Sequence, residues 1–345
     1  DAWYRAVPQI EIATAPAQDG AWEEEMHELH RLGVADAWIE LDPAQVQSIC
    51  RSPVFRGGAL QPVAATVQPA RLAFGLRRAL LERGVKIFEG TDVTAVDQQT
   101  GGVTVRTRGG RVRARSAVLA VNSATLHWRP FAGELSVASS HIVLTEPVPE
   151  VLEEIGWTGG EALCDCRQLL HYLRTTPDGR IAFGWGGGRL AFGARHGRLL
   201  DVDPQVVQIT EAALRRFFPQ LGGARVSDAW GGPIDVSPGR LAIFRSLGAL
   251  HAGWGFSGHG VGPSHLGGRI LAALALGAGE EFAGLPLLEP PRRRFPPEPL
   301  RWAGGSLARR ALMRRDRLAD GGRRVDPLTR AVAGLPKALG INLPR

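Results

Sequence analysis

The stretch Gly253-Trp-Gly-Phe-Ser-Gly-His-Gly-Val-Gly-Pro-Ser-His-Leu-Gly-Gly268 decides the fold of this chain. It follows a short apolar run at 249–253 and precedes an Ala- and Leu-rich segment at 269–276, so the pattern predicts a strand, a glycine-rich turn and a helix. Without Cβ atoms, the backbone N–H groups of such a turn can approach a ligand, and the helix N-terminus favours an anionic or electron-rich group. The stretch therefore predicts a cofactor cradle.

The same stretch contains a Gly-x-Gly-x-x-Gly spacing at Gly253, Gly255 and Gly258. A dinucleotide fingerprint requires a further strand after the helix and an acidic residue about 20 positions on to bind the ribose. The acidic pair Glu280-Glu281 lies near that distance, but it follows the glycines at which the helix is expected to end, and no strand precedes it. A nicotinamide enzyme is therefore the weaker interpretation, and a tight, glycine-packed turn is the structural alternative.

The composition is that of a folded globular protein. The chain has 345 residues, 44% hydrophobic and 22% charged, which suffices for the cores of one or two domains. Three cysteines, Cys50, Cys164 and Cys166, cannot form a disulfide framework, and their scarcity favours a reducing, cytoplasmic location. No apolar run approaches the about 20 residues that span a bilayer, and no signal peptide opens the chain. We expect structural cysteines, no metal site and no transmembrane segment.

The net charge of +7 is concentrated near the C-terminus. Residues 289–345 carry fourteen Lys or Arg and five Asp or Glu. This Pro- and Arg-rich tail offers only Phe295 and Trp302 as aromatic residues, so no nucleic-acid-binding module is expected. The pattern favours a solvated arm, or a helix at 306–318 whose arginines pack on the body or contact an acidic lipid surface.

Hydrophobic periodicity predicts a mixture of helices and strands. Helices are expected at 21–33, after Asp42-Pro43, and at 69–83, 150–155 and 204–218, and strands at 85–88, 92–97, 103–108, 112–121, 139–145, 169–175, 181–186, 224–230, 240–244 and 249–253. The helix at 69–83 places its leucines on one face, and the apolar run at 117–121 is typical of a strand buried on both faces.

This order predicts an α/β fold of mixed α+β character. We expect a first domain over 1–136, an inserted antiparallel sheet over 137–235, a return to the first domain over 236–288, and the basic tail over 289–345.

Few residues have the character of catalytic groups. His259 lies in the glycine-rich turn, where its imidazole either faces a cofactor or caps the helix. Asp235 either orients a cationic group or serves in an ordinary turn. Tyr172 and Arg174 share one face of a predicted strand, which lines a pocket or is solvated. The sequence contains no zinc-protease helix, Walker loop or nucleophile elbow, which disfavours hydrolase and kinase chemistry.

The segment Gly255-Phe-Ser-Gly-His-Gly-Val261, followed by a helix of small residues, resembles the C-terminal flavin-contacting motif of the FAD-dependent oxidoreductases related to D-amino-acid oxidase, glycine oxidase and sarcosine oxidase. Further segments are similar to that family in the same order: Thr66-Val-Gln-Pro-Ala-Arg-Leu72, the strand pair at 85–96, the buried strand at 117–124, Tyr172-Leu-Arg174 with 178–184, and 230–243. The resemblance implies non-covalently bound FAD, contacted by Val93, Ala120, Asn122, Gly255, Phe256, Ser257, Gly258, His259, Gly260 and Val261.

One part of the family pattern is missing. In that family a Rossmann strand, a Gly-x-Gly-x-x-Gly turn and an acidic residue bind the ADP half of FAD, and nothing before Gly57 supplies them. We therefore expect an FAD-binding-type domain that lacks its first βαβ unit and carries an inserted antiparallel-sheet substrate domain. The first residue is Asp1, which favours an N-terminally truncated chain that binds FAD poorly by itself.

The resemblance also implies a reaction. A neutral amine or amino acid would lose hydride from its α-carbon to the flavin, which oxygen or another acceptor would reoxidise. Gly262 stands where sarcosine-oxidase-like relatives can hold a lysine for the substrate carboxylate, and this favours an amine or polyamine substrate, with Asp235 pairing with an ammonium group. The alternative is a non-catalytic or degenerate flavoprotein-like subunit that acts by association.

Overall fold

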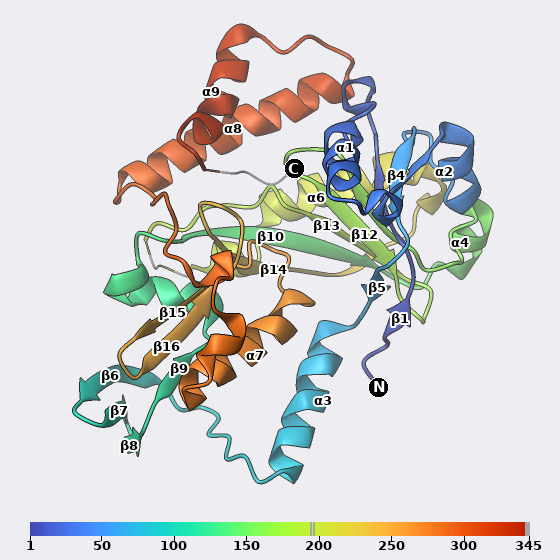
Figure 1. Ribbon diagram of the computed structural model, residues 1–345. Helices are drawn as coiled ribbons and strands as arrows, with labels where there is room; N and C mark the ends of the chain where they lie inside the picture. Colours follow the sequence, from blue (N-terminus) through green and yellow to red (C-terminus); the bar gives the residue numbers. More distant parts are fainter. Residues whose placement is uncertain (194, 196, 342–345) are drawn as a thin grey trace.

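The largest unit of the fold is an eight-stranded mixed sheet (Figure 1). The computed structural model describes residues 1–193, 195 and 197–341. The strand order is β14-β10-β13-β12-β11-β2-β4-β3, and β2 pairs with β11 in parallel. The bounds are β2 Gln9–Ile12, β3 Ile39–Leu41, β4 Gly58–Gln61, β10 Ser136–Thr145, β11 Ala162–Asp165, β12 His171–Thr175, β13 Ile181–Trp185 and β14 Val226–Val236. Strands β2, β3 and β4, from the first 61 residues, thus complete a sheet whose other strands come from residues 136–236.

One face of this sheet forms the main hydrophobic core. Along β10 the residues alternate between buried and half-buried, as expected of a strand with one face on a core. Helices α2 (Pro43–Ile49), α4 (Pro149–Ile155) and α6 (Pro204–Phe217) cover that face, and each begins with a proline that is pre-organised for the first helical turn. The opposite face of the sheet is left to carry polar side chains.

A second, three-stranded sheet carries the glycine-rich turn. Strands β15 (Ile243–Leu247) and β16 (Leu250–Trp254) form a hairpin, and β9 (Ala117–Leu119) pairs with β16 in parallel. The buried strand β16 runs into the turn, after which α7 (Pro263–Leu276) packs back through Ile270 and Leu271 against Phe244. The predicted strand, turn and helix are confirmed.

The remaining strands form small peripheral units. A three-stranded meander contains β6 (Val93–Gln99), β7 (Gly102–Thr107) and β8 (Gly110–Ala114), and the short strands β1 (Arg5–Ala6) and β5 (Ala65–Thr66) pair with each other. Helix α1 (Glu23–Arg31) and helix α3 (Pro69–Glu82) lie where the sequence predicts them.

Several local predictions are wrong. Residues 85–88 form no strand, and the predicted strand at 112–121 is divided into β8 and β9. The strands β2, β3 and β4 were not predicted, because runs of three or four residues are too short to show a period. The strand predicted at 240–244 begins only at Ile243, since Arg240 has a positive φ of 62° that a strand does not allow.

Two apolar surfaces are more exposed than their sequences predict. Strand β9 lies at the edge of its sheet, and its Val118 is 45% exposed, so the expected burial on both faces is wrong for this chain. Helix α3 projects from the body (Figure 1) and has no buried residue; its Phe74 is 71% exposed. No described segment covers the apolar face of α3.

The basic tail is folded. It forms the helices α8 (Leu300–Asp320) and α9 (Pro327–Ala338), which pack on each other as a hairpin at one end of the molecule (Figure 1). The predicted helix at 306–318 is part of α8, whereas α9 was not predicted. Over the described ranges, no helix combines the length and the apolar character that crossing a bilayer requires.

Neighbouring glycines of α7 offer a matched test of its packing. A Cβ on Gly267 would lie 2.8 Å from Cζ of the buried Phe244, whereas a Cβ on Gly268 would meet no atom within 4 Å. We expect Gly267→Ala to lower the free energy of unfolding by about 1–2 kcal/mol, because the core must shift to admit the methyl group. Gly268→Ala should raise it by roughly 0.5–1 kcal/mol through helix propensity. Urea unfolding measures both changes, and equal effects would contradict this packing.

Candidate functional site

The turn between β16 and α7 has backbone angles that glycine adopts most easily. Gly255 and Gly258 have φ values of +83° and +90°, and Ser257 between them has 55°. A Cβ on Gly255 would also lie 2.8 Å from the Cβ of Ser237. The glycines at 255 and 258 are therefore required by the shape of the turn, whatever ligand it binds.

Asp235 holds this turn in place from the end of β14. Its side chain is 2% exposed, and Oδ2 accepts a hydrogen bond from the N–H of Gly255 at 2.5 Å. Its backbone carbonyl accepts from the N–H of Ser257 at 2.9 Å. Burial raises the pKa of the Asp235 carboxyl, and the hydrogen bond from Gly255 opposes that rise. Asp235 therefore acts on the backbone of the turn as a positioning residue.

Backbone donors stand just before α7. In the part of the chain that is described, the N–H groups of Gly260, Val261 and Gly262 have no acceptor. They precede a helix of 14 residues, whose dipole is positive at this end. Gly260 and Val261 also line a cavity. An electron-rich carbonyl or an anion fits this position, as does the oxygen-bearing end of a flavin ring.

A cavity of about 510 Å³ lies between the turn, α7 and the end of β14. It brings together most of the predicted cofactor contacts, namely Ala120, Asn122, Phe256, Gly258, Gly260 and Val261, and the predicted catalytic residue Asp235. Seven further residues that the sequence does not predict as contacts complete the lining: Pro233, Ile234, Gly253, Ser264, Gly267, Gly268 and Leu271. The small residues of α7 and the Gly-Gly-Pro-Ile run before Asp235 are the signals that point to these positions.

Other predicted contacts lie outside this lining. Gly255 and the buried Ser257 form the back of the turn, and Val93 lies at the start of β6, about half exposed. Asn122 is in the lining with a positive φ of 48°, an uncommon conformation that is enriched at functional sites.

His259 lies at the turn beside an arginine that was not predicted. Nδ1 of His259 is 3.3 Å from Nη2 of Arg240. Partial burial, and then the Arg240 guanidinium, lower the pKa of His259 below its usual value, so its ring is neutral at pH 7. The positive charge next to the turn is therefore carried by Arg240, whose own pKa is lowered by burial while Glu25 of α1 opposes that change.

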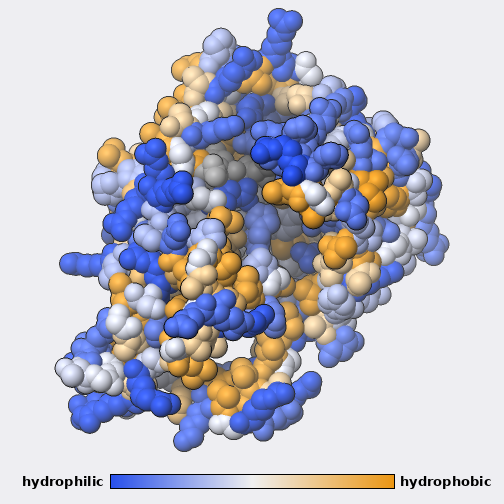
Figure 2. Space-filling model, in the orientation of Figure 1, coloured by the Kyte–Doolittle hydropathy of each residue, from blue (hydrophilic) through white to orange (hydrophobic). Residues whose placement is uncertain are grey.

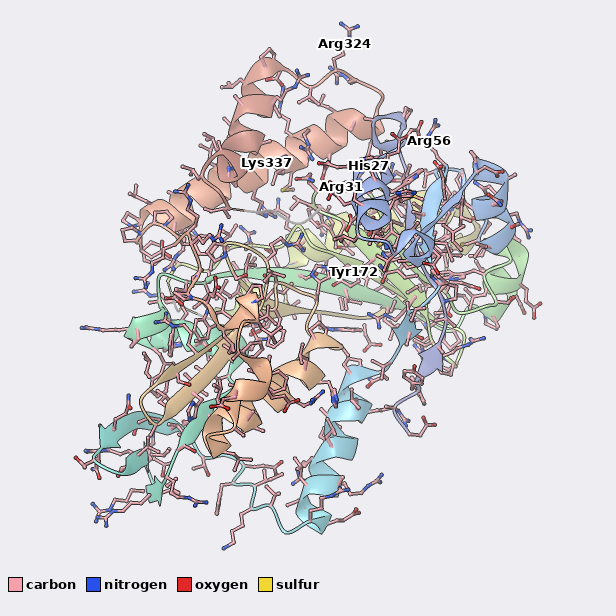
Figure 3. All side chains as sticks on the ribbon, in the orientation of Figure 1. His27, Arg31, Arg56, Tyr172, Arg324 and Lys337 are labelled. Carbon is pink, nitrogen blue, oxygen red and sulfur yellow. The ribbon has the colours of Figure 1, made fainter. Side chains whose placement is uncertain are left out.

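Tyr172 lies on the sheet face opposite the core, near the centre of the molecule (Figure 3). Its hydroxyl is 2.7 Å from Oγ of Ser140, and its ring fills the space over Gly184, where a Cβ would lie 2.1 Å from Tyr172 Cζ. Ser140 is two residues along β10 from Ala138, which pairs with Ile234 of the cavity lining. The Tyr172 hydroxyl thus points along the sheet towards the cavity.

Arg174 shares this face of β12 with Tyr172, as predicted from their spacing. Nη1 donates to the carbonyl oxygen of Val67 at 3.4 Å, and no described carboxylate forms an ion pair with it. Burial lowers the pKa of Arg174, but a guanidinium stays protonated in proteins. Arg174 is therefore a half-buried cation with donors left for a ligand.

The described residues include no group of three His, Cys, Asp or Glu side chains placed to hold a metal ion. His171 and Asp165 form a buried pair, with Nδ1 and Oδ2 2.7 Å apart, on the core side of the sheet. The three cysteines have free thiols.

The role of Asp235 makes a testable prediction. Asp235→Ala leaves the Gly255 N–H unsatisfied and should lower the free energy of unfolding by about 1–3 kcal/mol, whereas Asp235→Asn keeps an acceptor and should cost less. Because the folded-state pKa is raised, the wild-type carboxyl favours the folded state most below its unfolded pKa of about 4 and loses that contribution as the pH rises. The stability of Asp235→Asn relative to wild type should therefore rise with pH. Urea unfolding across this range measures it, and a falling difference would contradict it.

Comparison with known proteins agrees with this geometry. The family model described as FAD dependent oxidoreductase matches residues 1–274. A probable oxidoreductase OrdL of Rhizobium meliloti is 31% identical over 72% of this chain and 54% of its own length. The gamma-glutamylputrescine oxidoreductase of Escherichia coli is 29% identical over 80% of this chain and 62% of its own length. The chain thus spans little more than half the length of these relatives.

A solved structure extends the likeness to the fold. The glycine oxidase of Geobacillus kaustophilus superposes with a TM-score of 0.70 over 84% of this chain and 75% of that chain, at 18% identity. At that identity the likeness concerns the fold alone. Since the family model covers most of the chain, this chain belongs to the family of FAD-dependent oxidoreductases.

Proposed function

We propose that this chain belongs to an enzyme that uses FAD to oxidise the C–N bond of an amine or amino acid. In this proposal the chain binds the substrate and forms one wall of the flavin site. The cavity beside α7 carries this proposal, because free backbone donors there adjoin the sheet face that bears Tyr172. Relatives named gamma-glutamylputrescine oxidoreductase and sarcosine oxidase subunit beta support the same substrate class. Oxygen or another acceptor, and a cytoplasmic location in keeping with the free thiols, belong to this proposal.

The residues of the turn would hold the cofactor and tune it. Bound FAD supplies the hydride acceptor. The N–H groups of Gly260, Val261 and Gly262 would bind an electron-rich edge of the cofactor, and the N-terminus of α7 would stabilise negative charge there. Asp235 keeps these donors in position by holding the turn. This arrangement needs no side chain as an obligate acid or base, which suits an amine that binds in its neutral form.

The sheet face favours an elongated substrate with an anionic group. Arg174 pairs through Ala182 with Leu144, which is six residues along β10 from Ala138, the strand partner of the cavity residue Ile234. Six strand residues span about 20 Å, part of which the long Arg174 side chain covers. We propose that the amine end lies in the cavity, the chain lies over Tyr172, and a carboxylate binds Arg174. Gly262 supports this, because no lysine is present at the turn to bind a carboxylate there.

We further propose that a segment preceding Asp1 binds the ADP half of FAD and covers α3. The relatives extend well beyond the matched region. The exposed Phe74 and Leu76 of α3, and Val118 of β9, form apolar surfaces for such a segment to cover. Such a segment would bury the apolar side chains of α3, which no described residue covers.

Cofactor binding tests the family assignment and the missing segment separately. The gene is expressed with and without its upstream coding sequence, and the visible spectrum and FAD content of each product are measured. We expect about one FAD per chain in the longer product, weak binding in the 345-residue chain, and slowed amide hydrogen exchange in α3 of the longer product. Stoichiometric FAD in the shorter chain would contradict the missing segment. The absence of flavin from the longer product would contradict the proposed function.

Substrate binding tests the role of Arg174. We expect Arg174→Met to weaken the binding of an amine with a terminal carboxylate by about 10- to 100-fold, which is the range for a lost charged hydrogen bond. Anaerobic reduction of the flavin by the amine measures this affinity. The amine with a carboxamide in place of the carboxylate should reduce the flavin of the wild type and of the variant with equal affinity. Arg108→Met, at the exposed turn between β7 and β8, removes the same charge away from the site and should change neither substrate. Equal losses for both substrates would contradict carboxylate binding.

A further inference from the structure

The α8–α9 hairpin is fixed to the body of the protein. Arg309 of α8 donates through Nε to the carbonyl oxygen of Gly187 at 2.9 Å. Oδ2 of Asp316 accepts from the N–H of Leu169 at 3.3 Å, and Asp320 forms an ion pair with Arg167. The inner arginines of the tail thus pack on the body, as one of the sequence predictions proposed. The hairpin is a fixed platform whose other side faces solvent.

Unpaired cations gather on that outer side. Five exposed basic side chains have no acidic or hydrogen-bonding partner anywhere in the described ranges: Arg310, Arg317, Arg323, Arg324 and Lys337. Arg324 projects from the far end of the hairpin, and Lys337 lies on α9 (Figure 3). Because these side chains are not neutralised within the protein, they produce a positive field at this end of the molecule.

An apolar stripe runs along one edge of the exposed face of α9. Leu328 is 74% exposed, and Leu335 and the C-cap residue Leu339 follow it at i+7 and i+11, so the three lie along one line of α9 and its end. Arg330 and Lys337 lie about 180–200° around the helix from Leu328, so the exposed face of α9 carries leucines along one edge and basic residues along the other. Thr329, Ala333 and Pro336, on the buried face, hold α9 against the protein. Figure 2 shows hydrophobic and hydrophilic side chains interleaved over the α8–α9 end.

We propose that the outer side of the α8–α9 hairpin docks on an anionic lipid membrane. Exposed leucines and unpaired cations that share the outer side of one hairpin are typical of a helix that lies in the bilayer interface, where apolar side chains enter the acyl boundary and basic ones meet headgroups. A nucleic acid would satisfy the cations but leave the leucines in water. The hairpin lies beyond residue 274, where the match to the family model ends.

Vesicle flotation tests this surface independently of activity. The FAD-loaded protein is mixed with vesicles of phosphatidylcholine, with or without phosphatidylglycerol, at low and high salt. We expect binding only with phosphatidylglycerol. The triple variant Arg323→Gln, Arg324→Gln, Lys337→Gln should bind about a hundredfold more weakly, since each basic residue near an anionic surface contributes about fivefold. A second variant, Leu328→Ser with Leu335→Ser, keeps the charge and should also bind more weakly.

A matched control separates this surface from net charge. Arg108→Gln, Arg111→Gln, Arg113→Gln removes three exposed positive charges from the β7–β8 hairpin and should leave vesicle binding unchanged. Unaltered thermal unfolding of each variant shows that the fold is kept. Equal losses in the control, no effect of the leucine substitutions, or binding to duplex DNA in place of vesicles would each overturn the proposal.

Discussion

The hydrogen bond from the Gly255 N–H to the Asp235 carboxylate is the constraint on which the site depends. Strand β14 belongs to the large sheet and β16 to the small one, and this bond joins their ends. A buried acceptor is costly to leave unpaired, so the turn cannot move without losing it. The positions of the free N–H groups before α7 follow from this anchor. A redox site whose protein groups act mainly by position needs such rigidity.

The two faces of the large sheet differ in role: one packs on the hydrophobic core, and the other carries the side chains proposed to contact the substrate. Leu173, Phe183 and Val143 fill the core on one face, while their neighbours Tyr172 and Ile142 point to the other. The two-residue period of a strand makes this division automatic, since a slip by one residue would exchange the faces. Tyr172 occupies its place because Gly184 leaves room for its ring. The polar face is thus shaped by backbone register as much as by side-chain chemistry.

Exposed apolar side chains and unpaired charges on the surface also indicate what this chain binds. The apolar face of α3 and the cations of the α8–α9 hairpin lie far apart and differ in chemistry. The apolar face of α3 suits another protein segment, because burial of its hydrocarbon is the only interaction that would stabilise the contact. Mixed leucines and cations suit an interface that is itself both apolar and charged.

The sequence by itself determined the local features of this protein. Glycines at 255 and 258 specify a turn with positive φ, and the apolar run before them and the small residues after them specify a strand and a helix, because these preferences act over a few residues. Only the tertiary structure decided that Asp235 serves the backbone, that β2 joins β11 in parallel, and that Arg240 stands beside His259. These contacts join residues up to about 150 positions apart. No local pattern encodes such pairings, because they depend on the register and packing of the whole sheet.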